Sequence, residues 1–350
     1  MKSKITILFF LFTAVNTLIL DAGKKNQARL FQINNTTPLK FIIPDGWPKP
    51  PSNIFSNNPL TEEGFQLGRK LFYDGRLSKD GNFACASCHQ QFAAFATYDH
   101  DLSHGFHDQF TTRNAPPLFN LAWKKSYHWD GGINHIEVQA LSPMTASNEM
   151  AENVDSVLQK LRMDTSYIRM FKSAFGSNLI NSQRMLKAIA QFVGSMVSAN
   201  SKYDNVKRGG DKFNSAEARG YELYKINCAS CHKEPLFTDN SYRNNGLTLN
   251  DYMKDYGRMR ITGNSADSLK FIVPSLRNVS VTFPYMHDGR LYSLYKVVDH
   301  YRNGIQMSRT LDSSLRKSLN ITDAERDDIV YFLHTLKDTS FLNNKRFSQP

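Results

Sequence analysis

The chain has 350 residues, with 43 Lys and Arg against 32 Asp and Glu, which gives a formal net charge of +11. This length suffices for two domains of ordinary size. A positive charge is compatible with nucleic-acid binding. However, the first residues predict export from the cytoplasm, as described next, and an exported protein does not meet DNA. We therefore exclude nucleic acid as a partner and expect a solvated basic surface.

The chain begins with an apolar segment. The basic residues of MKSK precede ITILFFLFTAVNTLIL, a run that is shorter than the roughly 20 residues of a membrane span. A basic start followed by a short apolar run is typical of a secretory signal. We expect residues 1–22 to be a signal peptide and the rest to be periplasmic, with an uncleaved anchor as the alternative.

Three helices are predicted in the first half. The segment EEGFQLGRKLFYD covers residues 62–74. Val154, Val157, Leu158 and Leu161 fall on one face of a second helix. In the third, apolar residues recur with helical spacing: Leu186, Ile189, Ala190, Val193, Met196 and Val197.

The second half begins after SANSKYDNVKRGGDKFN (198–214), a polar, glycine-containing stretch that indicates a linker. Asn214 and Glu217 predict the start of a helix over AEARGYELYKIN. Thr322 and Glu325 form a capping box before the apolar residues of a last helix, Ile329, Val330, Leu333 and Leu336. We expect a mainly α protein with two domains, 23–206 and 207–350.

The pentapeptide CASCH occurs once in each half and uses all four cysteines: Cys85, Cys88, Cys228 and Cys231. C-x-x-C-H is the attachment signature of c-type haem. The two thiols bind the vinyl groups of one porphyrin, and the following His89 or His232 is the proximal iron ligand. The sequence therefore predicts two covalently bound haems c, one in each domain.

Other uses of C-x-x-C explain this pattern less well. Structural zinc sites pair such motifs about 15–20 residues apart and need no histidine directly after both. A thioredoxin-like dithiol requires a βαβ context that the sequence does not show. Disulfides account neither for the spacing nor for the histidines.

Further elements occur in both halves. An Arg-Asn pair follows each CASCH, at Arg113–Asn114 in TRNAP and at Arg277–Asn278 in LRNVS. A DG turn comes next, as HWDGG with Trp129 and as MHDGR with His287. These parallels indicate an internal duplication.

CASCHQQFAAFA, TRNAPPLFNLAW, HWDGG, PSLRNV and PYMHDGR together resemble the bacterial di-haem cytochrome c peroxidase family, over residues 45–340. This family includes the di-haem enzyme that matures methylamine dehydrogenase. The resemblance implies two cytochrome c-like domains. It also implies that the N-terminal haem reacts with peroxide and that the C-terminal haem relays electrons.

The resemblance assigns three catalytic residues. In the family a tryptophan in a WDG turn lies between the haems, followed by a glutamine ten residues on and a glutamate twenty residues on; Trp129, Gln139 and Glu149 match these positions. A carboxylate over the iron takes a proton from one peroxide oxygen and returns it to the other. Glu149 is the expected acid-base group, with a carboxylate in the first turn of a helix as the alternative interpretation.

The sixth ligand of the C-terminal haem departs from the typical peroxidase. At the position where those enzymes carry a methionine this chain has Tyr301, and the maturation enzyme also uses a tyrosine there. Met307 and the adjacent His300 are the alternatives. The loop HDLSHGFHDQF contains His100, His104 and His107, of which His104 is the candidate for a resting-state ligand of the N-terminal haem.

The resemblance also implies one calcium ion, with Asn114, Thr282 and Pro284 at the ligand positions. The expected function is reduction of hydrogen peroxide with electrons from a small donor protein such as cytochrome c. Peroxide-dependent oxidation of a partner protein, favoured by Tyr301 and Trp129, and a di-haem electron carrier are the alternatives. The sequence leaves a homodimer open.

Overall fold

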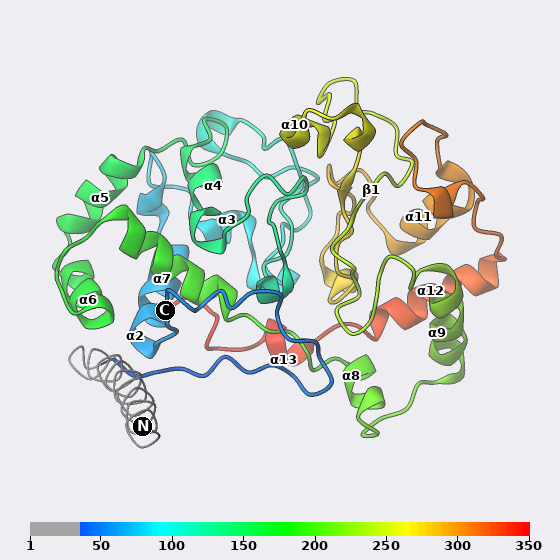
Figure 1. Ribbon diagram of the computed structural model, residues 1–350, viewed down its shortest axis with the longest axis horizontal. Coiled ribbons are helices and arrows are strands. Elements are labelled where there is room, and N and C mark those ends of the chain that lie inside the picture. Colours follow the sequence, from blue (N-terminus) through cyan, green and yellow to red (C-terminus); the bar gives the residue numbers. More distant parts are fainter. Residues whose placement is uncertain (1–35) are drawn as a thin grey trace, which may run out of the picture.

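The computed structural model describes residues 36–350, so the predicted signal peptide lies outside the described residues. Two helical lobes lie side by side (Figure 1). The helices are α2 (Glu62–Phe72), α3 (Cys85–Cys88), α4 (Leu141–Thr145), α5 (Val154–Arg162), α6 (Thr165–Phe175), α7 (Ser182–Gly194), α8 (Lys202–Lys207), α9 (Ser215–Asn227), α10 (Met259–Thr262), α11 (Leu294–Asp299), α12 (Asp323–His334) and α13 (Thr339–Leu342). The strands β1 (Tyr242–Arg243) and β2 (Phe271–Ile272) pair antiparallel.

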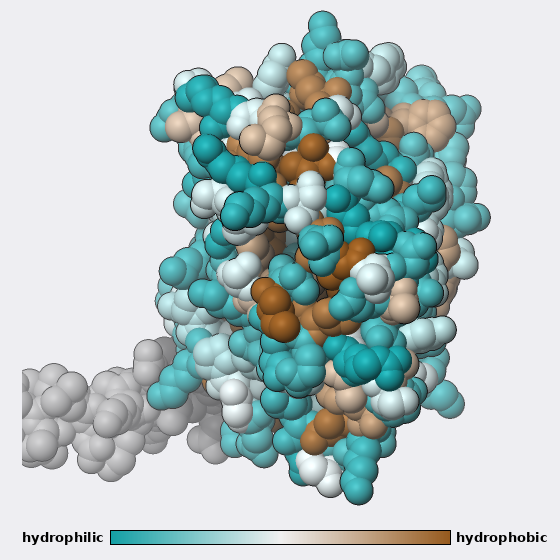
Figure 2. Space-filling view, turned by 90° about the vertical axis from the view of Figure 1, so that its right-hand side faces the viewer, coloured by the Kyte–Doolittle hydropathy of each residue, from teal (hydrophilic) through white to brown (hydrophobic). Residues whose placement is uncertain are grey.

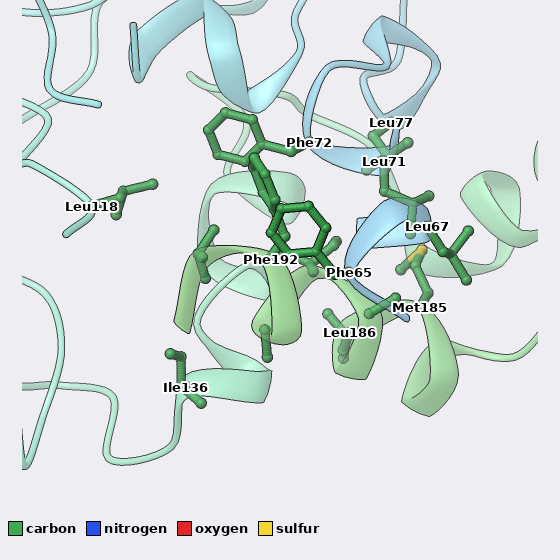
Figure 3. Close-up of a cluster of buried hydrophobic side chains, with 14 of the residues drawn as sticks. Phe65, Leu67, Leu71, Phe72, Leu77, Leu118, Ile136, Met185, Leu186 and Phe192 are labelled. Carbon is green, nitrogen blue, oxygen red and sulfur yellow. The ribbon is translucent and has the colours of Figure 1, made fainter. Parts of the chain in front are cut away.

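The N-terminal lobe is built on the crossing of α2 and α7, whose phenylalanine and leucine side chains form the core in Figure 3. The Thr61 side chain caps α2, and acidic residues in its first turn and basic ones in its last complement the helix dipole. At the crossing, a Cβ on Gly68 would overlap the carbonyl oxygen of Ala188. Glycine therefore permits the close approach of the two helices.

The C-terminal lobe repeats this crossing with α9 and α12. A Cβ on Gly220 would overlap the carbonyl oxygen of Asp328 and press on Phe332, just as Gly68 lies against Ala188 and Phe192. The capping boxes predicted at Asn214–Glu217 and Thr322–Glu325 are both present. The two lobes therefore share one helix-crossing geometry.

The structure matches the residues of the two halves differently from the sequence analysis, which paired Arg277–Asn278 with Arg113–Asn114. Asn278 corresponds to Asn120, because both have left-handed backbone and both precede a 3₁₀ turn. Each donates the same kind of hydrogen bond: Asn120 N donates to Met196 O, and Asn278 N donates to Leu336 O, just beyond α7 and α12. Arg113–Asn114 is thus a separate feature of the first lobe.

Two predicted boundaries are wrong. α7 ends at Gly194, so Met196 and Val197 lie beyond it. The segment predicted as a linker contains α8, which begins with a capping box between Ser201 and Asp204. Tyr203 is buried in the second core, and this burial holds α8 against the C-terminal lobe.

The end of the chain does not stay with the domain predicted for it. Phe341, Leu342 and Phe347 belong to the core of the N-terminal lobe, and the C-terminus lies beside α2 and α7 (Figure 1). Arg69 Nε donates to Ser348 O at 2.6 Å and Tyr73 Oη to Phe347 O at 2.8 Å. The last residues therefore tie the second lobe to the first.

The outer face of the C-terminal lobe is largely hydrophilic, with hydrophobic residues in small groups near its middle (Figure 2). This agrees with the predicted solvated surface. Within residues 36–350 we find no helix of sufficient length and apolarity to cross a membrane.

Candidate haem and peroxide site

The two histidines of the CASCH motifs are oriented as iron ligands. His89 Nδ1 lies 2.8 Å from the carbonyl oxygen of Phe95. His232 Nδ1 lies 3.2 Å from that of Phe237 and 3.1 Å from that of Pro274. Because a carbonyl oxygen only accepts, Nδ1 carries the proton and Nε2 keeps its lone pair for a metal. Burial lowers the pKa of His89 to about 4, which also favours the neutral imidazole.

The cysteines fit covalent haem attachment better than the alternatives. All four thiols are free, which contradicts the disulfide interpretation. Among residues 36–350 no group of three or more His, Cys, Asp and Glu side chains is arranged to hold a metal ion. Each lobe thus offers two thiols and one oriented imidazole, the donor set of haem c.

Glu149 lies in a turn between α4 and α5. Its backbone N donates to Ala146 O at 3.0 Å, and its backbone O accepts from Phe106 N at 2.8 Å. α5 begins only at Val154, after its N-cap Asn153, so Glu149 is not in the first turn of a helix. The alternative interpretation of this residue is therefore wrong.

The environment of Glu149 suits proton transfer. Burial raises the pKa of its carboxyl group above the ordinary value of 4.5. Its charge also contributes to the raised pKa of Cys88, after the larger effect of burial, so the carboxyl group lies near the first haem-attachment motif. A carboxyl group with a raised pKa exchanges a proton more readily near neutral pH.

Trp129 lies at the contact between the lobes. Its ring is 8% exposed and packs with Phe271 and Ile272 of the C-terminal lobe. Its Nε1 donates to Asn114 O at 2.8 Å, and its carbonyl oxygen accepts from Ile272 N at 2.8 Å. Trp129 is therefore fixed between the two lobes that carry the haem motifs.

Arg113 forms an ion pair across this boundary. Its guanidinium group binds Asp130, which follows Trp129, at 2.6 Å and Asp255 of the other lobe at 2.6 Å. All three side chains are 15% exposed or less. The sequence signals this residue through the TRNAP motif but does not identify its partners.

Gln139 follows a 3₁₀ turn at Ile136–Val138 and is half-buried. Its backbone lies near the ring of His128, whose pKa is lowered by burial. His128 in turn influences the pKa of His89. The structure therefore places His128 beside the first haem motif, a residue that the sequence analysis missed although it precedes Trp129.

Tyr301 lies in a π-helical turn at His300–Gly304, a rare geometry that is frequent at functional sites. Burial raises the pKa of its phenol to about 12, and its hydroxyl group is near Asn245, Cys228 and Cys231. Met307 is 69% exposed, and His300 Nε2 is engaged with Asn245 O at 2.9 Å. Of the three candidates, Tyr301 is the one placed beside the second haem motif.

The three loop histidines of the first lobe are all exposed. The ring centroids of His100 and His104 lie 5.3 Å apart, and those of His104 and Phe110 lie 4.6 Å apart. His107 stacks on Phe106 at 4.0 Å. The structure brings none of them into the lobe.

The residues predicted to bind calcium lie on adjoining loops. Asn114 N donates to His287 O at 2.9 Å, three residues after Pro284, and Asn114 Nδ2 donates to Asp101 O at 3.1 Å. Phe283, between Thr282 and Pro284, packs on Tyr98 at 4.7 Å. The loop of Asn114 is thus hydrogen-bonded to the loop of the other lobe that follows Pro284.

Comparison with known proteins agrees with this arrangement. Residues 62–212 match the family model of di-haem cytochrome c peroxidase, and residues 217–337 match that of cytochrome c. The chain is 36% identical to the methylamine utilization protein MauG of Methylorubrum extorquens, over 92% of this chain and 88% of that protein. The chain belongs to the di-haem cytochrome c peroxidase family.

Two further relatives support this membership. Cytochrome c551 peroxidase of Nitrosomonas europaea is 33% identical, over 82% of this chain and 84% of that protein. A crystal structure of a MauG-like protein associated with microbial copper homeostasis superposes with a TM-score of 0.79 at 32% identity, covering 89% of this chain and 99% of that chain. The protein is therefore a peroxidase-family oxidoreductase with two cytochrome c-like domains and two haems c.

Proposed function

We propose that this di-haem peroxidase reduces hydrogen peroxide to water at its N-terminal lobe. The observation that carries this proposal is Glu149, a half-buried carboxyl group with a raised pKa, near Cys88 of the first haem motif. The haem, when bound, supplies the iron that holds one peroxide oxygen and accepts electrons.

Glu149 acts as the acid-base group. It takes the proton from one peroxide oxygen and returns it to the other, so that water leaves. The carboxamide of Gln139 orients the peroxide through hydrogen bonds. Two electrons and two protons convert each hydrogen peroxide into two water molecules.

Trp129 is the relay between the lobes. An indole is readily oxidised. This one donates from Nε1 to Asn114 O of its own lobe, and the backbone carbonyl oxygen of Trp129 accepts from Ile272 N of the other. Electrons enter from a small donor protein such as cytochrome c at the C-terminal lobe. The apolar segment at the start of the chain supports a periplasmic location.

Steady-state oxidation of reduced cytochrome c by peroxide tests the role of Glu149. In Glu149→Gln the amide cannot exchange the proton, so we expect a loss of about 100-fold or more in kcat. Glu222→Gln is the matched control, since Glu222 is a surface carboxylate on α9 whose side chain is 65% exposed. Equal activity of the two variants would refute the assignment.

Tyr301 favours a second candidate function, the peroxide-dependent oxidation of a partner protein. The half-buried phenol of Tyr301 lies beside Cys228 and Cys231. With haem bound, it would lose its proton on ligating the iron, and this anionic ligand would give the C-terminal haem a lower potential than a methionine does. A low potential makes this haem a poor store of electrons from cytochrome c. Slow cytochrome oxidation together with fast peroxide consumption supports this candidate.

We also propose that one calcium ion binds Asn114, Thr282 and Pro284; the hydrogen bond from Asn114 N to His287 O, which joins the loops that carry these residues, supports the proposal. A chelator then lowers the thermal midpoint of the wild type, and added calcium restores it. A midpoint that a chelator leaves unchanged would contradict the site.

A further inference from the structure

Three tyrosines lie in contact with one another next to the second haem-attachment motif, Cys228–His232. Tyr203 is on α8, and Tyr221 and Tyr224 are on α9; we call them the tyrosine cluster. The hydroxyl group of Tyr224 donates to the carbonyl oxygen of His232, the proximal ligand residue. The cluster therefore starts at the proximal side of the C-terminal haem site.

The phenol rings form a continuous path from there toward the surface. Tyr224 is fully buried, and its ring is stacked on that of Tyr221 with centroids 6.2 Å apart and planes 13° apart. The rings of Tyr221 and Tyr203 are also 6.2 Å apart. At the outer end, Lys207 and Lys225 lie over the Tyr221 ring at 5.5 and 5.0 Å, and their side chains are 50% and 44% exposed.

One tyrosine has a proton acceptor in place. A phenol gives up an electron readily only if its proton leaves at the same time. The hydroxyl group of Tyr203, 2% exposed, donates to Glu234 Oε2 at 2.7 Å. This carboxylate lies 3.7 Å from Lys207 Nζ, at the surface end of the cluster.

Packing alone does not require these hydroxyl groups. Phe332 in the same core contacts all three rings, and Phe237 contacts those of Tyr203 and Tyr224, both without a polar atom. A buried hydroxyl group must find a hydrogen-bond partner, so phenylalanine is the simpler residue for a core. The arrangement of phenols with a carboxylate at one end therefore points to a chemical use.

We propose that the tyrosine cluster is a radical relay that carries oxidising equivalents between the C-terminal haem site and the surface of α8 and α9. The proposal rests on the proposed function, in which peroxide is the oxidant. Tyr203 gives one electron to the oxidised haem site through Tyr224 and Tyr221. Its O–H bond breaks, the proton moves to Glu234, and a neutral tyrosyl radical remains. An external one-electron donor at the surface restores the phenol, and the proton returns from Glu234.

Electron paramagnetic resonance of the holoenzyme tests this relay. The protein, with and without ring-deuterated tyrosine, is mixed with hydrogen peroxide in the absence of donor and frozen. We expect a radical signal that deuteration narrows, because the unpaired electron is on a phenol ring. Tyr203→Phe and Glu234→Gln each lose most of this signal.

Tyr331→Phe is the matched control, because Tyr331 is a half-exposed tyrosine on α12 of the same lobe. It keeps the full signal. The relay is refuted if deuterated tyrosine leaves the signal unchanged, or if Tyr203→Phe and Tyr331→Phe give equal intensities. Optical spectra of the ferric haems verify that each variant is folded and loaded.

Peroxide turnover of the same samples separates this inference from the proposed function. If the wild type consumes peroxide but gives no Tyr203 radical, the relay fails while the function stands. If it does not consume peroxide, the function fails, and illumination of tris(bipyridine)ruthenium(II) with persulfate, which takes up the electron and leaves ruthenium(III), then supplies the oxidant. A radical lost in Tyr203→Phe under light still supports the relay, and its absence from the wild type refutes it.

Discussion

Arg113 of the N-terminal lobe binds both carboxylate oxygens of Asp255 in the C-terminal lobe, with Nε–Oδ2 at 2.6 Å and Nη2–Oδ1 at 2.9 Å. The same guanidinium group donates to Asp130, the residue after Trp129, at 2.6 Å. This paired contact fixes the indole between the lobes. If electrons pass through Trp129 as proposed, their path depends on the contacts of Arg113.

Asp255→Asn weakens this contact. We expect a loss of about 3 kcal/mol in the free energy of unfolding, at the low end for a broken buried ion pair because Asp130 still contacts Arg113. Urea unfolding followed by tryptophan fluorescence measures it. Asp251→Asn, at an exposed position in the same segment, serves as the control, and an equal stability of both variants would contradict the account.

The same pair gives the stability a pH dependence. Burial by itself would raise the pKa of Asp255, but hydrogen bonds and charge from Arg113 outweigh it and hold this pKa below its ordinary value of 3.8. Arg260 and His287 are the other basic groups nearby, and Asp288 also faces His287. Because the folded-state pKa is the lower one, the stabilisation is complete above pH 3.8 and is lost as the pH falls through the folded-state pKa.

Thermal midpoints measured from neutral pH down to pH 3 test this expectation. At the lowest pH values of this range, the thermal midpoint of the wild type should fall more steeply than that of Asp255→Asn. The variant has no carboxyl group at position 255 to protonate. Parallel curves for the two proteins would show that Asp255 does not contribute.

Tyr301→Met changes one haem only. We expect a new methionine-ligated spectrum and a raised reduction potential of the C-terminal haem, with the N-terminal haem unaltered, because a thioether replaces a phenol at that iron. Optical redox titration measures both haems. Met307→Leu is the control, and a spectral change in that variant, or none in Tyr301→Met, would contradict the ligand assignment.

The helix crossings do not tolerate a side chain at their glycines. Gly68→Ala and Gly220→Ala should each lose about 3 kcal/mol of stability, the upper end of the usual cost of overpacking, because the new methyl group meets a backbone carbonyl. Gly210→Ala is the control, since its nearest neighbour would lie 3.6 Å away. Denaturant unfolding compares the three, and a neutral Gly68→Ala would refute the close crossing.

Local signals in the sequence predicted much of this molecule. The two CASCH motifs and the capping boxes at Asn214 and Thr322 act within a few residues, so their chemistry is readable directly. The capping box at Ser201 was equally readable, but the polar composition around it suggested a linker. Glu149 was predicted from a resemblance to the family. Its raised pKa could not be predicted from the sequence, because it results from burial in the folded chain.

Contacts between distant residues could not be predicted. Arg113 and Asp255 are 142 residues apart, and no local pattern relates them. The return of Phe347 to the first core and the match of Asn278 with Asn120 likewise depend on how the lobes pack. The contacts of Arg113 hold the segment of Trp129 in place, so the sequence predicted a role for this residue without showing what holds it.

Stopped-flow mixing of the haem-loaded protein with hydrogen peroxide and reduced cytochrome c tests the central claim most directly. The account predicts rapid oxidation of cytochrome c over many turnovers in the wild type and its loss in Glu149→Gln. Peroxide consumption that leaves cytochrome c reduced, or full activity of Glu149→Gln, would contradict it.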